Sequence, residues 1–210
     1  QRLIEEDKGD PEVQQAHLMQ LVEQLRQSPV ALETSAAHEQ HYEVPAAFYQ
    51  QVLGKHLKYS SCYYQPGVTS LDEAEAEMLR ITVERAQLKN GECILELGCG
   101  WGSLSLYMAA KYPEIQISGV SNSHSQREFI MAQAKARGLS NLEIITCDVN
   151  VLEFARDRQF DRVVSVEMFE HMRNYQTLLR RISTWVKPGG TLFVHIFTHR
   201  EYAYPFEVRD

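Results

Sequence analysis

The chain has 210 residues, of which 44% are hydrophobic and 23% charged, the ordinary balance of a globular protein. This length suits one sizeable α/β domain with a short extra segment. The net charge of −7 argues against a nucleic-acid partner, which would need a basic surface. No apolar run approaches the roughly 20 residues of a membrane helix, so we expect no integral membrane segment.

The cysteines carry no sign of a metal or disulfide framework. Cys62, Cys93, Cys99 and Cys147 form no CxxC pair and no cysteine-histidine cluster with zinc-like spacing. We therefore expect no metal, and reduced thiols in a cytoplasmic protein.

The first third of the chain predicts helices around an aromatic loop. Apolar residues at helical spacing predict a helix over 11–27, and a shorter one over 45–53 ends before Gly54. An irregular segment, HLKYSSCYYQPGV, follows. A long helix is predicted over 71–88, with Asn90-Gly91 as its stop.

From residue 92 onward, strands and helices alternate. Strands are predicted over 92–97, 115–120, 142–146, 162–166 and 191–197, and helices over 103–111, 125–137 and 175–185, with a turn of helix over 150–154. This alternation predicts an α/β fold with a parallel sheet covered by helices on both faces. We divide the chain into a helical segment with a covering loop, 1–75, and a core, 76–210.

A glycine loop follows the first strand, in the text LELGCGWGS. Gly98, Gly100 and Gly102 would let the backbone approach a ligand and aim helix N–H groups at it. The third glycine comes one residue too early for the dinucleotide fingerprint G-x-G-x-x-G. No Lys-Ser/Thr pair follows, which excludes a phosphate-binding P-loop.

The fourth strand runs directly into two carboxylates and an imidazole, in the text VEMFEHM. Ligands of open α/β sheets bind at the carboxyl ends of the strands. If the chain turns helical there, Glu167, Glu170 and His171 fall at positions i, i+3 and i+4. We then expect all three side chains to point to one place beside the glycine loop.

Several motifs in order resemble the cyclopropane-fatty-acid synthase family, most closely its coclaurine-type N-methyltransferases. They are HYEVPAAFYQQVLG, LKYSSCYY, LELGCGWGSLS, GVSNSHSQ, FEHM and KPGGTLFVHIF, and they cover roughly 41–205. The resemblance implies a Rossmann-like class I methyltransferase fold and S-adenosylmethionine as cofactor. Such sheets have seven strands, the last one antiparallel. Five are visible here, so we expect the C-terminal strands to be missing.

The resemblance also implies which residues hold the cofactor. Tyr59 and Ser60 would contact its methionine end, above the loop formed by Glu96, Gly98, Gly100 and Gly102. An acid usually grips the ribose at the end of the second strand, but this chain reads Ser121-Asn122 there, with Gln126 further on. We expect these three residues to replace the acid. Further positions implied are Asp148 and Val149 for the adenine and Val166 near the sulfonium.

For an amine acceptor, the site must bind an ammonium, remove a proton and align the nitrogen with the methyl group. We predict Glu170 and His171 as the catalytic pair, with Glu167 holding the amine. The partner would be a small aromatic or alkaloid-like amine.

Two alternatives stay open. Cyclopropane synthases, by resemblance, hold bicarbonate near this Glu-His pair and methylate an acyl-chain alkene. A small residue usually stands at position 167 there, and a carboxylate at that position would repel bicarbonate but attract an ammonium. The other alternative is a cofactor-binding fragment without turnover. Whichever function applies, we expect a second copy of the chain or a further segment to cover the fifth strand.

Overall fold

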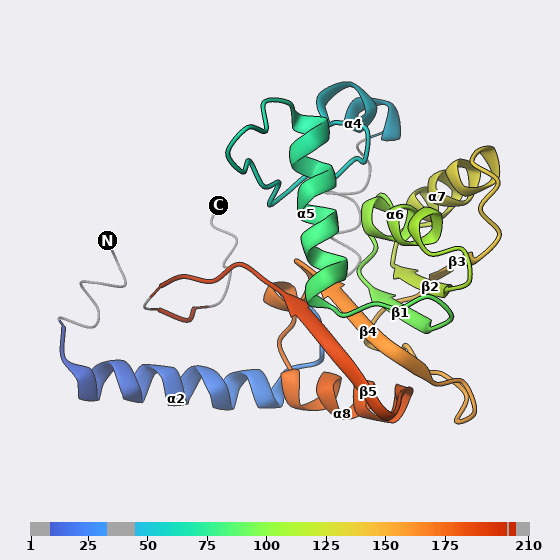
Figure 1. Cartoon of the computed structure of the whole chain (residues 1–210). Coiled ribbons are helices and arrows are strands. Elements are labelled where there is room, and N and C mark those ends of the chain that lie inside the picture. Colours follow the sequence, from blue (N-terminus) through green and yellow to red (C-terminus); the bar gives the residue numbers. More distant parts are fainter. Residues whose placement is uncertain (1–8, 33–44, 201, 205–210) are drawn as a thin grey trace.

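The computed structural model of the chain describes residues 9–32, 45–200 and 202–204. Within them the centre is a sheet of five parallel strands in the order β3-β2-β1-β4-β5 (Figure 1). The strands are β1 (Cys93–Leu97), β2 (Gln116–Ser121), β3 (Leu142–Thr146), β4 (Phe160–Val166) and β5 (Val186–His195). The predicted α/β fold with a parallel sheet is confirmed.

Helices cover both faces of the sheet, because the strand residues are apolar on both sides. In β1, Ile94 packs in one core cluster while Leu95 and Leu97 pack in the other. The first cluster lies under α5 (Leu71–Arg85), α6 (Ser103–Lys111) and α7 (His124–Ala136). The second lies under α8 (Tyr175–Trp185), beside β5 in Figure 1.

The N-terminal helix α2 (Pro11–Gln27) projects away from the sheet, and none of its residues is buried (Figure 1). The Asp10 side chain caps it by accepting two backbone hydrogen bonds. The chain then returns to the body, where Ala31 bridges to Met172 and its N–H donates to Asn150 at 3.0 Å. The short helix α4 (Ala46–Val52) agrees within one residue at each end with the helix predicted over 45–53.

Helix α5 ends at Arg85, three residues before its predicted end. Gln87 has the left-handed φ of 55°, and the N–H groups of Gln87 and Leu88 donate to Glu84 and Val83. This is a Schellman ending with Gln in the place usually taken by glycine. The signal at Asn90-Gly91 was therefore wrong as a helix stop. The predicted domain boundary at 75/76 falls inside α5, and that division stays a prediction.

Strand β5 begins before the turn that we expected to precede it. Phe160 pairs with Val186 and Arg162 pairs with Thr191, so four residues are looped out where the partner strand has one. The looped-out residues are 187–190, with the sequence Lys-Pro-Gly-Gly, and Gly189 among them has a left-handed φ of 79°. The turn of helix predicted over 150–154 is also wrong, since that segment holds only a turn.

Candidate active site

The carboxyl ends of β1 and β4 form the point where the strand order reverses. From β1 the chain steps outward through β2 and β3, then crosses to β4 on the other side of β1. Helices after the two inner strands leave toward different faces of the sheet, which opens a crevice between them. The glycine loop follows β1, and the segment with Glu167, Glu170 and His171 follows β4. The fold therefore brings the two segments to the same edge of the sheet.

The glycine loop has a left-handed backbone at each of its three glycines, with φ of 79°, 50° and 81°. A Cβ atom at Gly102 would lie 2.6 Å from Ile130 of α7, and one at Gly98 would lie 3.0 Å from Met168. Gly100 differs, since a Cβ atom added there would meet the Tyr59 ring at 3.4 Å, an ordinary contact distance. Gly98 and Gly102 thus leave room for neighbouring side chains, whereas Gly100 lies beneath the Tyr59 ring.

A buried carboxylate anchors the loop that carries Tyr59. Glu75 of α5 is fully buried and accepts backbone hydrogen bonds from Gly54 at 2.9 Å, His56 at 2.7 Å and Lys58 at 3.2 Å. These bonds fix the chain just before Tyr59 and Ser60. The contact that we predict between these two residues and the cofactor stays a prediction. Glu75 itself was missed, because a single Glu in an amphipathic helix gives no signal of burial.

Glu96 lies on β1 facing α6, 3% exposed, and accepts a hydrogen bond from the Ser105 hydroxyl. Burial raises the pKa of Glu96 to about 7, although the Ser105 bond and the charge of Lys58 act in the opposite direction. With this pKa the carboxyl changes its charge near neutral pH, and its predicted place beneath the cofactor stays a prediction.

The prediction that Glu167, Glu170 and His171 share one helix face is wrong. Glu167 has a left-handed φ of 52°, and its N–H donates to the carbonyl of His195 at 2.7 Å, so pairing with β5 continues one residue beyond β4. A helix cannot start there, and only a short 3₁₀ turn, η1 (Phe169–His171), follows. Glu167 is therefore separated from the short turn that carries Glu170 and His171.

The Glu167 carboxylate accepts a hydrogen bond from the Ser61 hydroxyl and thereby joins β4 to the covering loop. Its pKa is lowered: burial alone would raise it, but bonds from Ser60 and Ser61 and the charges of Lys58 and His195 outweigh burial. Glu167 therefore stays ionised and is already bonded.

Glu170 is different. Both of its carboxylate oxygens are buried, and neither has a hydrogen bond with any residue that the structure describes. The adjacent His171 is exposed, and no hydrogen bond joins it to Glu170. The Glu170 charge contributes to the raised pKa of Tyr175, after burial of that phenol. A carboxylate buried without a donor is costly unless a partner binds it.

The residues predicted for the adenosine part lie at the ends of β2 and β3. The Ser121 hydroxyl donates to Gln126 at 2.6 Å and accepts from the Ser123 N–H at 3.0 Å, and Ser121 and Gln126 are both buried. Asp148 accepts from the Asn150 N–H at 2.7 Å. Asn122 and Val166 are half-buried and Val149 is 9% exposed. Their contacts with a cofactor stay predictions.

Unsatisfied polar atoms support a ligand at this end of the sheet. In the described part of the chain, five buried side-chain nitrogen or oxygen atoms lack a hydrogen-bond partner. Four of them belong to Ser103 after the glycine loop, Thr146 at the end of β3, and Glu170. Buried polar groups rarely stay unpaired, so the site fits a polar ligand such as the predicted cofactor and an amine.

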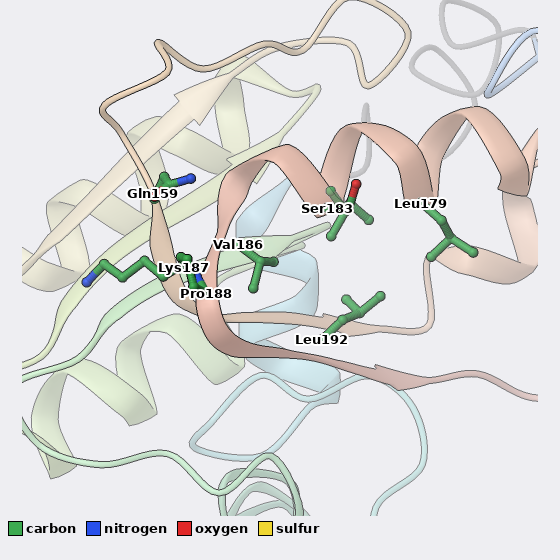
Figure 2. A pocket seen from close by; sticks show the side chains of 8 residues that line it. Gln159, Leu179, Ser183, Val186, Lys187, Pro188 and Leu192 are labelled. Atoms are coloured by element: carbon green, nitrogen blue, oxygen red, sulfur yellow. The ribbon is translucent and has the colours of Figure 1, made fainter.

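A separate hollow of about 550 Å³ lies between α8 and β5 (Figure 2). Leu179, Val186 and Leu192 line it. Val186 is the first residue of β5, so this hollow opens toward the amino ends of the strands, away from the glycine loop. It does not belong to the candidate site.

The geometry defines the class of protein: a class I methyltransferase fold, with a parallel sheet and a glycine loop at its switch point. Residues 31–206 match the family described as Mycolic acid cyclopropane synthetase, and the chain belongs to this family. The predicted resemblance is confirmed.

Relatives and solved structures agree with this assignment. The chain is 43% identical over 203 residues to "(S)-coclaurine N-methyltransferase" of Thalictrum flavum subsp. glaucum, covering 97% of this chain and 56% of that relative. The crystal structure of coclaurine N-methyltransferase with N-methylheliamine and SAH superposes with a TM-score of 0.93 at 40% identity, covering 100% of this chain and 60% of that one. A cyclopropane-fatty-acyl-phospholipid synthase of Escherichia coli K12 is 35% identical over 159 residues, 75% of this chain and 39% of that relative. The chain thus spans little more than half the length of its N-methylating relatives.

Proposed function

We propose that this chain carries the cofactor site and the catalytic Glu170–His171 pair of an S-adenosylmethionine-dependent N-methyltransferase, acting on a small aromatic or alkaloid-like amine. The observation that carries the proposal is the buried, unpartnered Glu170 carboxylate after β4, at the same edge of the sheet as the glycine loop. The similarity to relatives named for N-methylation of coclaurine supports the amine as acceptor.

The cofactor would supply an electrophilic methyl group, and the chain's own residues would prepare the acceptor. Tyr59, Ser60 and the glycine loop would hold the methionine end, with Glu96 beneath. An amine arrives mostly as an ammonium, which a buried carboxylate attracts and hydrogen-bonds. His171, next in sequence to Glu170, would receive the proton that leaves the nitrogen.

We expected Glu167 to hold the amine, but its contacts favour Glu170 for that task. Glu167 is already bonded to Ser61 and lies near the ammonium of Lys58. A carboxylate with these partners attracts a second cation less than one with none. Glu167 is therefore proposed to close the covering loop over the cofactor.

The test begins with calorimetric titration of the chain with S-adenosylhomocysteine. Transfer of a labelled methyl group is then assayed on simple tetrahydroisoquinolines and on vesicles of unsaturated phospholipid. Transfer to the amines alone supports the proposal, and transfer to the vesicles alone supports the cyclopropane-type alternative. Binding without transfer to either acceptor supports a cofactor-binding fragment, and absence of binding contradicts all three.

Variants of Glu170 and His171 test the catalytic assignment. Glu170→Gln and His171→Ala should each lower kcat/KM for the amine by roughly 100-fold or more and leave the affinity for S-adenosylhomocysteine within about twofold. Glu153→Gln, an exposed acid beyond β3, is the matched control. Undiminished turnover in both variants would remove the pair from the mechanism.

Two further expectations stay predictions: a cytoplasmic location, and a second copy or further segment covering β5. All four cysteines are free. Among the described helices, none has the length and hydropathy needed to cross a bilayer.

A further inference from the structure

Lys58 is a buried cation beside the candidate site. It immediately precedes Tyr59 in the covering loop and is only 7% exposed. Lysine is almost never this buried without a partner. Yet its ammonium makes no hydrogen bond or ion pair with any described residue.

The carboxylates around Lys58 are all bonded elsewhere. Its electrostatic neighbours include Glu167, Glu75 and Glu96. Glu167 accepts from Ser61, Glu75 accepts from three backbone N–H groups, and Glu96 accepts from Ser105. Burial lowers the pKa of Lys58, and the neighbouring carboxylates only partly offset this effect. The three acids thus keep a charged lysine tolerable at this position without binding it directly.

The backbone places this ammonium at the switch point. The Lys58 N–H is held by Glu75, and the next residue, Tyr59, lies against Gly100 of the glycine loop. Three residues after Lys58, Ser61 is bonded to Glu167 at the end of β4. The backbone at Lys58 is therefore fixed between the ends of β1 and β4, and most of the side chain is enclosed there.

We propose that Lys58 binds the α-carboxylate of the cofactor's methionine part. This inference rests on the proposed function, because S-adenosylmethionine and S-adenosylhomocysteine both carry that carboxylate. An unbonded ammonium held beside the glycine loop matches an anionic group at close range, and a carboxylate on it completes the pairing that the protein alone leaves open. Lys58 is then a binding residue for the cofactor and not part of the acceptor site.

The test compares ligands that differ in the carboxylate alone. Calorimetry is done with S-adenosylhomocysteine and with its decarboxylated analogue, for the wild-type chain, Lys58→Met, and the control Lys55→Met. Lys55 lies in the same loop and is exposed. Lys58→Met should weaken the binding of S-adenosylhomocysteine by roughly 10- to 100-fold and leave the analogue nearly unaffected. Lys55→Met should change neither affinity.

Other outcomes overturn the inference. Equal losses for both ligands, or no loss for either, would show that Lys58 does not meet the carboxylate, while binding by the wild type would leave the proposed function standing. If the wild type binds neither ligand, both proposals fail together.

A second measurement keeps the inference testable if Lys58→Met does not fold. Lysine side-chain resonances of the wild-type protein are followed by NMR, with the Lys58 signal assigned from Lys58→Arg. S-adenosylhomocysteine should shift the Lys58 signal and the decarboxylated analogue should not. A signal that responds equally to both ligands, or to neither, contradicts the assignment.

Discussion

Replacing Glu96 with Gln should make the protein's stability less sensitive to pH. The Glu96 carboxyl is buried beside Ser105, and its pKa rises from an ordinary 4.5 to about 7. A carboxyl with a raised folded-state pKa holds its proton more tightly in the folded protein than in the unfolded chain. Its contribution is therefore fully present below pH 4.5 and is lost as the pH rises to about 7.

The size of this effect follows from the two pKa values. One pKa unit corresponds to about 1.4 kcal/mol, so ionising Glu96 in the ligand-free protein costs about 3 kcal/mol. Of this, about 2.5 kcal/mol falls between pH 5 and pH 8. The Gln side chain cannot ionise and still offers a carbonyl oxygen to Ser105, so the variant should lack the loss.

Urea denaturation of both proteins at pH 5, 6.5 and 8 measures the effect. The free energy of unfolding of Glu96→Gln, relative to wild type, should increase by about 2.5 kcal/mol from pH 5 to pH 8. Glu153→Gln, which changes an exposed acid, should show no such trend. A constant difference between Glu96→Gln and wild type at all three pH values would refute the raised pKa.

Two further substitutions test the supports of the site. Gly102→Ala forces a left-handed φ of 81° on a residue whose Cβ meets Ile130, and should cost roughly 2–4 kcal/mol in urea denaturation. Gly138→Ala, with a φ of 67° in open space, should cost only about 1–2 kcal/mol, and equal losses would contradict the packing role of Gly102. Glu75→Gln leaves backbone donors facing an amide and should lower stability by roughly 2 kcal/mol and weaken S-adenosylhomocysteine binding in calorimetry. Glu84→Gln, an exposed ion-pair partner on the same helix, should cost less than about 1 kcal/mol, and an equal effect would argue against the anchor.

The sequence by itself determined the order of strands and helices and the position of the glycine loop. These features follow from patterns among near neighbours: apolar strands, helical spacing and glycines after a strand. That the end of β4 lies near the glycine loop was expected from a general rule, since ligands of open α/β sheets bind at the carboxyl ends of the strands. The end of α5 was missed because Gln87 adopts a left-handed backbone that glycine usually takes.

Only the tertiary structure decided what each charged side chain meets. Glu167 bonds to Ser61, which lies 106 residues earlier in the chain, and its backbone pairs with β5. That pairing prevented the expected helix and separated Glu167 from Glu170. Glu75 likewise bonds to the backbone of Gly54, His56 and Lys58, which lie 17 to 21 residues earlier in the chain. Burial and pairing set the energy of a charge, and both arise only when the chain is folded.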